Sequence, residues 1–448
     1  MNTLNHGFSR TLLVAITLIP CVATSVLGQV IHEDSKLVTD DMGESNRIGR
    51  SVAIDNGIIA FGVREHWSNK IDTSAAYLFD VTTRSQLLQL IPNDSIVDSW
   101  YGSSIVIEDN IVAVGAPNDQ GSGAVFLFDA TTGEQLARFT PDKVLFGEYF
   151  GSSIAIDHGI MAVGATGSEL DGRRLVGAVY LFDLATGTQI AKLQPDEGIH
   201  HLFFGISVAI DDGLVVVGAR GGFDAGSAYI FDATTGERIT KLLPTGEPSF
   251  GQFGNAVDIQ DGVIAIGAPT ISRVGTTYLF DAATGNLLHE LRPETAELSD
   301  HFGTSVSIDD GLVVIGAMNY SDTVSSGLDF AYVYDISSGE LLSTLAPSDH
   351  GLEDIFSNSI AMENGVVIAS ATDVNDAEER NASIYIFDFN ELPCTVDFTG
   401  DGEINFFDLS VFLYALGRRE QIADLTNDGN WNYFDVSAFL LAYSAGCP

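Results

Sequence analysis

The feature that most constrains the fold is a sequence repeat of 49 to 54 residues that continues to about residue 390. One copy, Phe204 to Gln252, begins Phe-Gly-Ile-Ser-Val-Ala-Ile, Asp-Asp-Gly, Leu-Val-Val-Val-Gly-Ala. After a polar loop it continues Ser-Ala-Tyr-Ile-Phe-Asp, a Thr-Thr-Gly turn, and Glu-Arg-Ile-Thr-Lys-Leu-Leu-Pro. The copies start at Ile48, Tyr101, Phe150, Phe204, Phe253, Phe302 and Phe356. A fixed period of this length is typical of a propeller or solenoid, in which neighbouring units bury each other's apolar faces.

Each copy holds four short runs rich in Val, Ile, Tyr and Phe, separated by turn residues, which predicts four strands. The first two runs are joined by pairs such as Asp212-Gly213, which accept the positive φ of a tight hairpin turn. The turn between the third and fourth runs begins with Asp in every copy, and we interpret these side chains as turn caps: Asp80, Asp129, Asp183, Asp232, Asp281, Asp335 and Asp388. Four antiparallel strands in each of seven units predict an all-β fold, a seven-bladed β-propeller.

The two ends of the repeat region indicate how the ring closes. Copies one to six end their fourth strand in Pro, whereas the seventh ends at Asp388 and lacks a fourth strand. Before the first copy, Lys36-Leu37-Val38-Thr39-Asp40 matches the fourth-strand segment Lys192-Leu193-Gln194-Pro195-Asp196. We therefore expect an N-terminal strand, from residues around Ile31 to Val38, to be the outer strand of blade seven.

The repeat resembles the FG-GAP family, best known from integrin α chains. The residues that carry the resemblance are the Phe-Gly pairs at the copy starts and, at the second strand, Val114-Gly115-Ala116-Pro117 and Ile266-Gly267-Ala268-Pro269. The resemblance covers roughly residues 30 to 390 and implies a propeller. Some members bind calcium in an Asp-rich loop inside the blade. The corresponding turns here are only two residues long, so we do not transfer that calcium role.

Residues 1–28 have the pattern of a secretion signal, because Arg10 precedes an apolar run from Leu12 to Leu27. No other stretch approaches the ~18 consecutive apolar residues of a membrane span, so we expect no transmembrane segment. The mature protein is therefore expected to be secreted, either extracellular or at the cell surface. With 61 acidic and 20 basic side chains the net charge is −41, which argues against nucleic acid as a partner.

Ligand residues are expected in the loops between the second and third strands and in those between copies. Propellers usually present both loop sets on one face. Aromatic and basic side chains in or beside them suit stacking on sugar rings as well as packing at blade edges: Trp67, Trp100, Tyr149, Phe203, Tyr320, Arg173, Arg174, His200 and His201. No known catalytic motif is present, so no catalytic residue is named. Carboxylates across the central channel remain an open route to catalysis.

The pattern changes after the propeller, predicted as residues 29–390, and we expect residues 391–448 to form a small separate domain. Two matched segments start at Asp397 and Asp424. Each has oxygen-bearing side chains at positions 1, 3, 5, 9 and 12 of a twelve-residue calcium loop, and position 7 offers a backbone carbonyl. The predicted ligands of two calcium ions are Asp397, Thr399, Asp401, Glu403, Asn405 and Asp408, and Asp424, Thr426, Asp428, Asn430, Asn432 and Asp435.

Each loop runs into an apolar helical stretch, Leu409 to Leu416 and Val436 to Tyr443. Tandem half EF-hands with Asp at position 12 resemble a type I dockerin, the module that attaches cellulosomal enzymes to cohesins. The resemblance implies a cohesin-like partner. Positions 10 and 11 hold Phe406-Phe407 and Tyr433-Phe434 instead of a polar pair, so packing against the propeller or another surface anchor is an equal alternative.

Cys394 and Cys447 bracket this small domain and are the only cysteines after the predicted signal. In an exported protein such a pair is expected to form a disulfide.

Together these patterns favour a secreted, calcium-binding recognition or adhesion protein with a dockerin-like attachment module and a protein or glycan partner. The alternative is a polysaccharide-active enzyme, or an accessory protein, delivered by the dockerin. A third interpretation is a purely structural surface or matrix component.

Overall fold

The computed structural model describes residues 29–37, 46–65, 74–93, 99–142, 146–196, 200–221, 225–246, 250–293, 300–318, 329–348, 354–373, 383–389, 398, 406–419, 423, 431, 436 and 439. The chain divides between Glu391 and Leu392 into two compact units. In the part of the chain so described, no helix is both long and apolar enough to cross a membrane.

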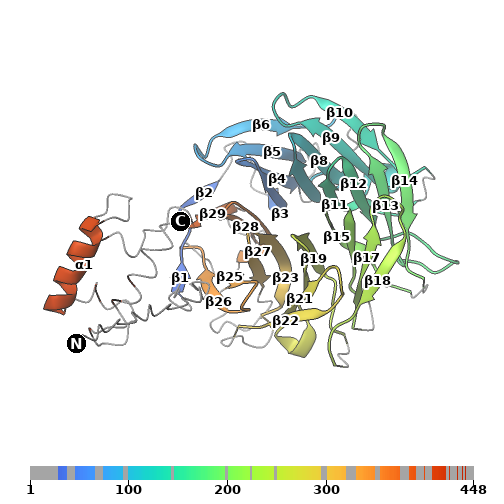
Figure 1. Ribbon diagram of the computed structural model, residues 1–448. Coiled ribbons are helices and arrows are strands. Elements are labelled where there is room, and N and C mark those ends of the chain that lie inside the picture. The colour runs from blue at the N-terminus through green and yellow to red at the C-terminus, as the bar shows by residue number, and fades with distance from the viewer. Residues whose placement is uncertain are drawn as a thin grey trace, which may run out of the picture. The chain divides into compact units, whose positions relative to one another are not determined.

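The larger unit is a seven-bladed β-propeller, as the repeat predicts (Figure 1). Blades one to three consist of β3 (Asn46–Asp55), β4 (Ile58–Glu65), β5 (Ala75–Asp80) and β6 (Gln86–Leu90); β7 (Ser104–Glu108), β8 (Ile111–Ala116), β9 (Ala124–Asp129) and β10 (Gln135–Phe139); and β11 (Phe150–Asp157), β12 (Ile160–Ala165), β13 (Ala178–Asp183) and β14 (Thr188–Leu193). Blades four and five consist of β15 (Phe204–Asp211), β16 (Leu214–Ala219), β17 (Ser227–Asp232) and β18 (Arg238–Leu242); and β19 (Ala256–Gln260), β20 (Val263–Ala268), β21 (Thr276–Asp281) and β22 (Leu287–Leu291).

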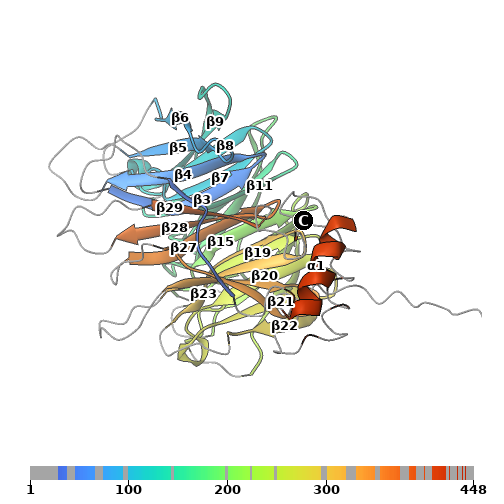
Figure 2. The ribbon, with the colours of Figure 1, turned by 90° about the vertical axis from the view of Figure 1, so that its left-hand side faces the viewer.

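Blades six and seven each take a strand from the N-terminal segment. They consist of β23 (Phe302–Asp309), β24 (Leu312–Ala317), β25 (Phe330–Asp335), β26 (Leu341–Leu345) and β1 (Gln29–Ile31); and β27 (Asp354–Glu363), β28 (Val366–Asp373), β29 (Ser383–Asp388) and β2 (Ser35–Leu37). Two 3₁₀ turns, η1 (Asp119–Gly121) and η2 (Ile271–Arg273), follow β8 and β20. The first strand of each blade lies nearest the central axis, and β27 packs on β3 to complete the circle (Figures 1 and 2).

The predicted turn chemistry is confirmed. Asp212 and Gly213 both have positive φ, 44° and 78°, as a two-residue hairpin turn requires. In the turn between the third and fourth strands, Asp232 Oδ1 accepts the N–H of Thr235 at 2.7 Å and that of Thr234 at 2.9 Å. The N–H of Thr235 is the main cause of a lowered pKa at Asp232. The equivalent Asp caps this turn in blades one to six, whereas the residues that follow Phe389 after Asp388 lie outside the described part.

The Phe-Gly and Gly-Ala pairs of the repeat meet at the joints between blades. The side chain of Phe204 is fully buried and packs edge-on against Tyr229 and Phe231 of its own blade. At the next-but-one joint, a Cβ added to Gly267 would fall 2.0 Å from the carbonyl oxygen of Gly303. A side chain at that position has no room, because the backbones of neighbouring blades touch there.

The closure of the ring is confirmed, with one difference from the expected strand. β2 pairs antiparallel with β29, with Leu37 opposite Ile384, and becomes the fourth strand of blade seven. Ile31 instead belongs to β1, which adds to blade six in parallel, opposite Leu345 of β26. Between the two strands, both oxygens of Glu33 bind Ser348, its N–H and its hydroxyl, each at 2.7 Å. The N-terminal segment thus adds a strand to each of two blades. The sequence does not predict β1, because a strand added in parallel at an outer edge has no counterpart in the other copies of the repeat.

In the smaller unit the helix expected over Leu409 to Leu416 is present as α1 (Phe406–Arg418). Phe412 and Phe439 occupy equivalent positions of the two matched segments and stack with centroids 4.5 Å apart and 11° between their planes. Phe398 packs against both rings. The two segments therefore share one small apolar core. Of the second expected helix, Val436 to Tyr443, only Val436 and Phe439 are described, and both are helical.

Candidate functional site

One end of the propeller axis carries a ring of acidic side chains. They are the last residues of the seven inner strands, six carboxylates and one amide: Asp55, Glu108, Asp157, Asp211, Gln260, Asp309 and Glu363. We call these seven residues the carboxylate ring and this end of the axis the turn end, because the first hairpin turn of each blade lies here. No motif search finds the ring, but its position directly before the first turn of each copy does, with an acidic residue in six copies and Gln260 in the fifth.

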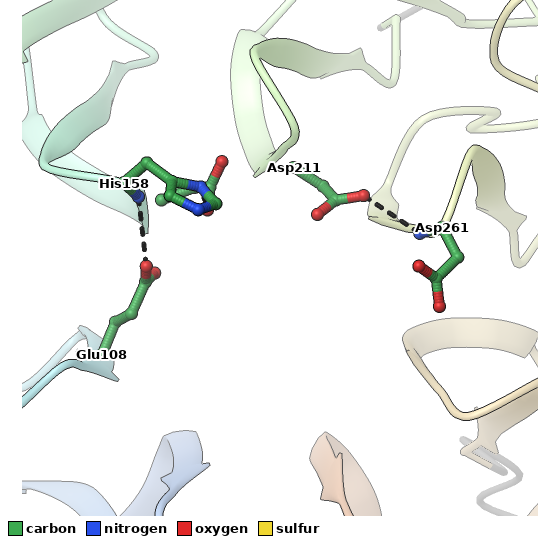
Figure 3. Close-up of polar contacts among 5 residues, drawn as sticks. Glu108, His158, Asp211 and Asp261 are labelled. Carbon is green, nitrogen blue, oxygen red and sulfur yellow. Dashed lines mark hydrogen bonds and ion pairs between the residues drawn. The ribbon is translucent and has the colours of Figure 1, made fainter.

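Backbone N–H groups of the next blade occupy most of these side chains. Figure 3 shows Glu108 Oε1 accepting the N–H of His158 at 3.2 Å and Asp211 Oδ2 accepting that of Asp261 at 3.0 Å. The same contact joins Asp55 to Asp109 at 3.1 Å, Gln260 to Asp310 at 3.2 Å, Asp309 to Asn364 at 2.5 Å and Glu363 to Asn56 at 2.8 Å. The last of these links blade seven to blade one, so the ring has a structural role in holding neighbouring blades together.

Burial and the charges of neighbouring acids raise the pKa of two members of the ring, Glu108 and Asp211. Burial, followed by the charges of Asp157, Asp109 and Asp55, raises the pKa of Glu108 to about 7. Two residues inward from Gln260, burial raises the pKa of Asp258 to about 7 as well, although it accepts the N–H groups of Ile259 and Ile308 at 2.9 and 2.7 Å. The blade joints made by Glu108 and Asp258 are thus pH-sensitive. Among the described residues no group of three or more acidic, His or Cys side chains is placed to hold a metal ion.

The opposite end of the axis, the loop end, holds bulky side chains on strained backbone. The residue before the first aromatic of five successive blades has φ between 45° and 59° and a half-buried side chain: Trp100, Tyr149, Phe203, Gln252 and His301. We call these five residues the loop-end ring. The left-handed region is unfavourable for bulky L-residues, and such strain accumulates at binding and catalytic sites. This ring is therefore our candidate ligand site.

Ring contacts connect the members of the loop-end ring with their neighbours. Trp100 and Tyr149 lie parallel, with centroids 5.8 Å apart and 8° between their planes. The guanidinium carbon of Arg220 lies 5.1 Å from the ring centroid of Phe203, and the ring of His201 lies 6.0 Å from the same centroid. Three successive blades thus present aromatic rings together with cationic or imidazole groups.

Buried polar contacts position Tyr149. The preceding residue, Glu148, is only 2% exposed. Its Oε1 accepts the hydroxyls of Ser168 at 3.1 Å and Tyr180 at 3.3 Å, and Lys192 Nζ lies 4.0 Å away. These partners all belong to blade three, so they tie the backbone before Tyr149 to that blade and hold its ring in place.

The structure brings together most of the loop residues expected to meet a ligand. Trp100, Tyr149 and Phe203 belong to the loop-end ring. Arg174 and His201 are neighbours, since the N–H of His201 donates to the carbonyl of Arg174 at 3.4 Å. Arg173 and His200 are exposed beside them, whereas Trp67 and Tyr320 lie outside the described residues. Sequence reasoning missed Arg220, Gln252 and His301, although the position before each Phe-Gly pair marks the last two.

Most of the predicted calcium ligands and both cysteines lie outside the described residues. These are Asp397, Thr399, Asp401, Glu403, Asn405, Asp424, Thr426, Asp428, Asn430, Asn432, Asp435, Cys394 and Cys447. Asp408 is described and is fully buried in the first turn of α1. Asp408 is the residue predicted at position 12 of the first loop, and both calcium sites stay a prediction. The proposed signal, residues 1–28, also lies outside the described part.

Comparison with known proteins supports the propeller repeats. A family model described as the FG-GAP repeat matches residues 134–182, 188–231 and 289–334. Each matched stretch runs from the outer strand of one blade to the third strand of the next, so the family's unit spans a joint between blades. No curated protein matches the chain. The chain therefore carries FG-GAP repeats in a seven-bladed propeller, an architecture that fits a recognition or adhesion protein.

Proposed function

We propose that this is a secreted recognition or adhesion protein whose propeller binds its ligand at the loop end. The observation that carries the proposal is the loop-end ring, where five successive blades hold a large side chain in an unfavourable backbone conformation at the same position. A purely structural position would favour Gly there, because Gly adopts positive φ at no steric cost. The strain is explained if the side chains serve a ligand.

A double variant tests this proposal. Trp100→Ala with Tyr149→Ala removes the parallel ring pair and leaves the blade joints intact. The matched control is Phe250→Ala, since Phe250 also has a positive φ of 58° and is 59% exposed in a loop of blade five but is not in the ring. We expect ligands found by glycan array and by pulldown from the secreted fraction to be lost with the double variant and kept with the control. Equal binding by all three proteins would contradict the proposal.

The C-terminal unit is proposed as a dockerin-like module that binds two calcium ions and attaches the protein to a cohesin-like partner or a surface anchor. The two loops of residues 397–408 and 424–435, the buried Asp408 and the shared aromatic core of the two segments support it. When bound, each calcium ion would be held by the oxygen atoms of one loop. A disulfide between Cys394 and Cys447 would close the module. Calcium titration of the full chain should give two sites, and Asp397→Ala with Asp424→Ala should remove both.

A polysaccharide-active enzyme is the second candidate, and one observation favours it. The pKa of Glu108 is raised to about 7 while acidic neighbours surround it, and a protonated acid beside an ionised one is the arrangement of glycosidases. Its Oε1 already accepts the N–H of His158, however, which gives the residue a structural use. Release of reducing sugar by the wild type and its loss in Glu108→Gln would favour the enzyme.

A further inference from the structure

Positive charge gathers at the loop end of blades three and four. The chain has 20 Lys and Arg against 61 acidic residues, yet five Arg and His side chains lie here in adjoining loops: Arg173, Arg174, His200, His201 and Arg220. We call these five residues the basic cluster. The N–H of Phe203 donates to the carbonyl of Leu175 at 3.1 Å, and the N–H of Gly221 donates to that of Leu202 at 3.1 Å. These bonds join the three loops, and Arg220 and His201 lie against the ring of Phe203.

Arg220 differs from two other arginines of the propeller, Arg138 and Arg238. Arg138 and Arg238 form ion pairs with Asp119 and Asp196. Arg220 is half-buried, and within the described residues its guanidinium has no carboxylate partner and contacts the face of Phe203 instead. Burial lowers the pKa of Arg220. A partly buried charge is unfavourable without a counter-ion, so the absence of a carboxylate partner among the described residues favours an anionic ligand in so acidic a protein.

The side chains next to the basic cluster narrow the class of anion. Phe203 and Tyr149 hold the same position in neighbouring blades, and the ring of Tyr149 is paired with that of Trp100. Half-exposed aromatic rings on successive blades suit a ligand with repeated apolar ring faces, as the C–H faces of sugar rings are. The planar fork of a guanidinium matches a carboxylate through two parallel hydrogen bonds. The carboxylates of an acidic peptide could pair with Arg220, but such a peptide has no regularly repeated apolar ring faces to pack on the aromatic side chains.

We propose that the loop end binds a carboxylate-bearing polysaccharide, with Arg220 receiving a uronate carboxylate and Trp100, Tyr149 and Phe203 contacting the sugar rings. This inference rests on the proposed recognition function and names its ligand class. Among the exposed members of the basic cluster, Arg174 already pairs with Glu169, with 3.3 Å between Nε and Oε1. The protein and the polymer are both strongly negative, so they repel each other at long range. Salt at 0.1 M screens this repulsion beyond about 10 Å, so binding should persist when salt is added.

The test measures binding of three probes to the full-length protein: polygalacturonate, neutral dextran and poly-glutamate. Arg220→Gln should weaken polygalacturonate binding by about tenfold or more, and Arg220→Lys should restore only part of it, because Lys keeps the charge without the fork. Arg273→Gln is the matched control, since Arg273 is an exposed arginine of the equivalent loop in blade five. It should change the affinity by less than about twofold.

The outcomes distinguish binding of a carboxylate-bearing polysaccharide from the more general recognition function on which it rests. Preferential binding of polygalacturonate that depends on Arg220 and not on Arg273 supports the inference. Equal losses in the two glutamine variants would overturn it, because the attraction would then be unspecific, and so would equal binding of poly-glutamate. If the wild type binds neither acidic probe but retains another ligand that needs Trp100 and Tyr149, the inference fails and the recognition function stands. If no ligand depends on those two rings, both fail.

Discussion

The two ends of the propeller axis use the same repeat in opposite ways. At the turn end almost every blade places an acidic residue at the same position, and the backbone of the next blade occupies its oxygens. At the loop end the same backbone position carries Trp, Tyr, Phe, Gln or His, all at positive φ. Uniform residues with internal partners indicate a structural role, whereas varied residues held under strain indicate recognition. The acidic residues thus join the blades at one end, and the other end is where we propose that a ligand binds.

Removal of the N-terminal segment that closes the propeller should lower its thermal stability more than any other change considered, because both ends of the axis depend on the closed ring. Deletion of residues 29–37 removes β2 from blade seven, takes Leu37 out of an apolar core, and exposes the edge of β29. We expect the midpoint of thermal unfolding to fall by about 10 °C or more. Deletion of residues 29–31 alone is the control, since blade six keeps its four regular strands without β1. Calorimetry showing equal stability for both truncations would refute the closure.

A methyl group at a blade joint should have the next largest effect. Gly267→Ala places a Cβ against the carbonyl oxygen of Gly303, and backbone on both sides prevents relaxation. We expect a loss of at least about 3 kcal/mol in the free energy of unfolding, measured by denaturant titration. Gly262→Ala is the control, because Gly262 has open space around it and loses only its left-handed freedom, φ 76°. That variant should cost about 1 kcal/mol.

The sequence predicts the ring well because the repeat encodes it locally. Hairpin turns such as Asp212-Gly213, the caps such as Asp232 and the missing fourth strand after Asp388 are all visible within single copies. The parallel pairing of β1 with β26 is not, because Gln29 and Ser343 lie far apart in sequence and any outer edge would accept such a strand. Only the three-dimensional ring shows which edge is taken.

The candidate site was predictable in part. Trp100, Tyr149 and Phe203 are conspicuous as aromatics in variable loops, but Gln252 and His301 share their geometry without sharing their chemistry. The strain that unites the five residues is a property of the backbone, which composition does not report. Arg220 likewise stands out only in three dimensions. Its contact with Phe203 joins two loops, and whether an acidic side chain lies near it cannot be read from the sequence.

The pH dependence of the unfolding free energy tests whether the buried acid Asp258 has a structural role at the turn end. The folded-state pKa of Asp258, about 7, lies above the ordinary value near 4, so the folded state holds its proton more tightly than the unfolded chain. The resulting stabilisation is fully present below about pH 4 and is lost as the pH rises to about 7. Asp258→Ser should therefore gain roughly 2–4 kcal/mol at pH 8 relative to pH 4, judged by unfolding at both values.

Serine is the matched replacement because the next blade already uses it. Ser307 holds the equivalent position and accepts the N–H of Met362 at 3.1 Å, so a serine at 258 keeps a hydrogen bond to Ile308 without a charge. Ser307→Ala is the control and should cost about 1 kcal/mol at every pH. Residual pH dependence from Glu108 is expected in both variants. An unchanged difference between pH 4 and pH 8 in Asp258→Ser would show that this joint does not titrate as described.

The smallest expected effect is a gain in stability at the loop end, whereas the changes at the blade joints are expected to lower stability. Gln252 has φ 54°, and a glycine there adopts the same backbone without steric strain. Gln252→Gly should therefore raise the free energy of unfolding by about 1 kcal/mol, because the left-handed region costs an L-residue roughly that much. Gln260→Gly, within the ladder of β19 and accepting the N–H of Asp310, is the control and should lose stability. If both variants lose stability, position 252 carries no strain, and the argument that the loop-end ring is maintained for a ligand loses its basis.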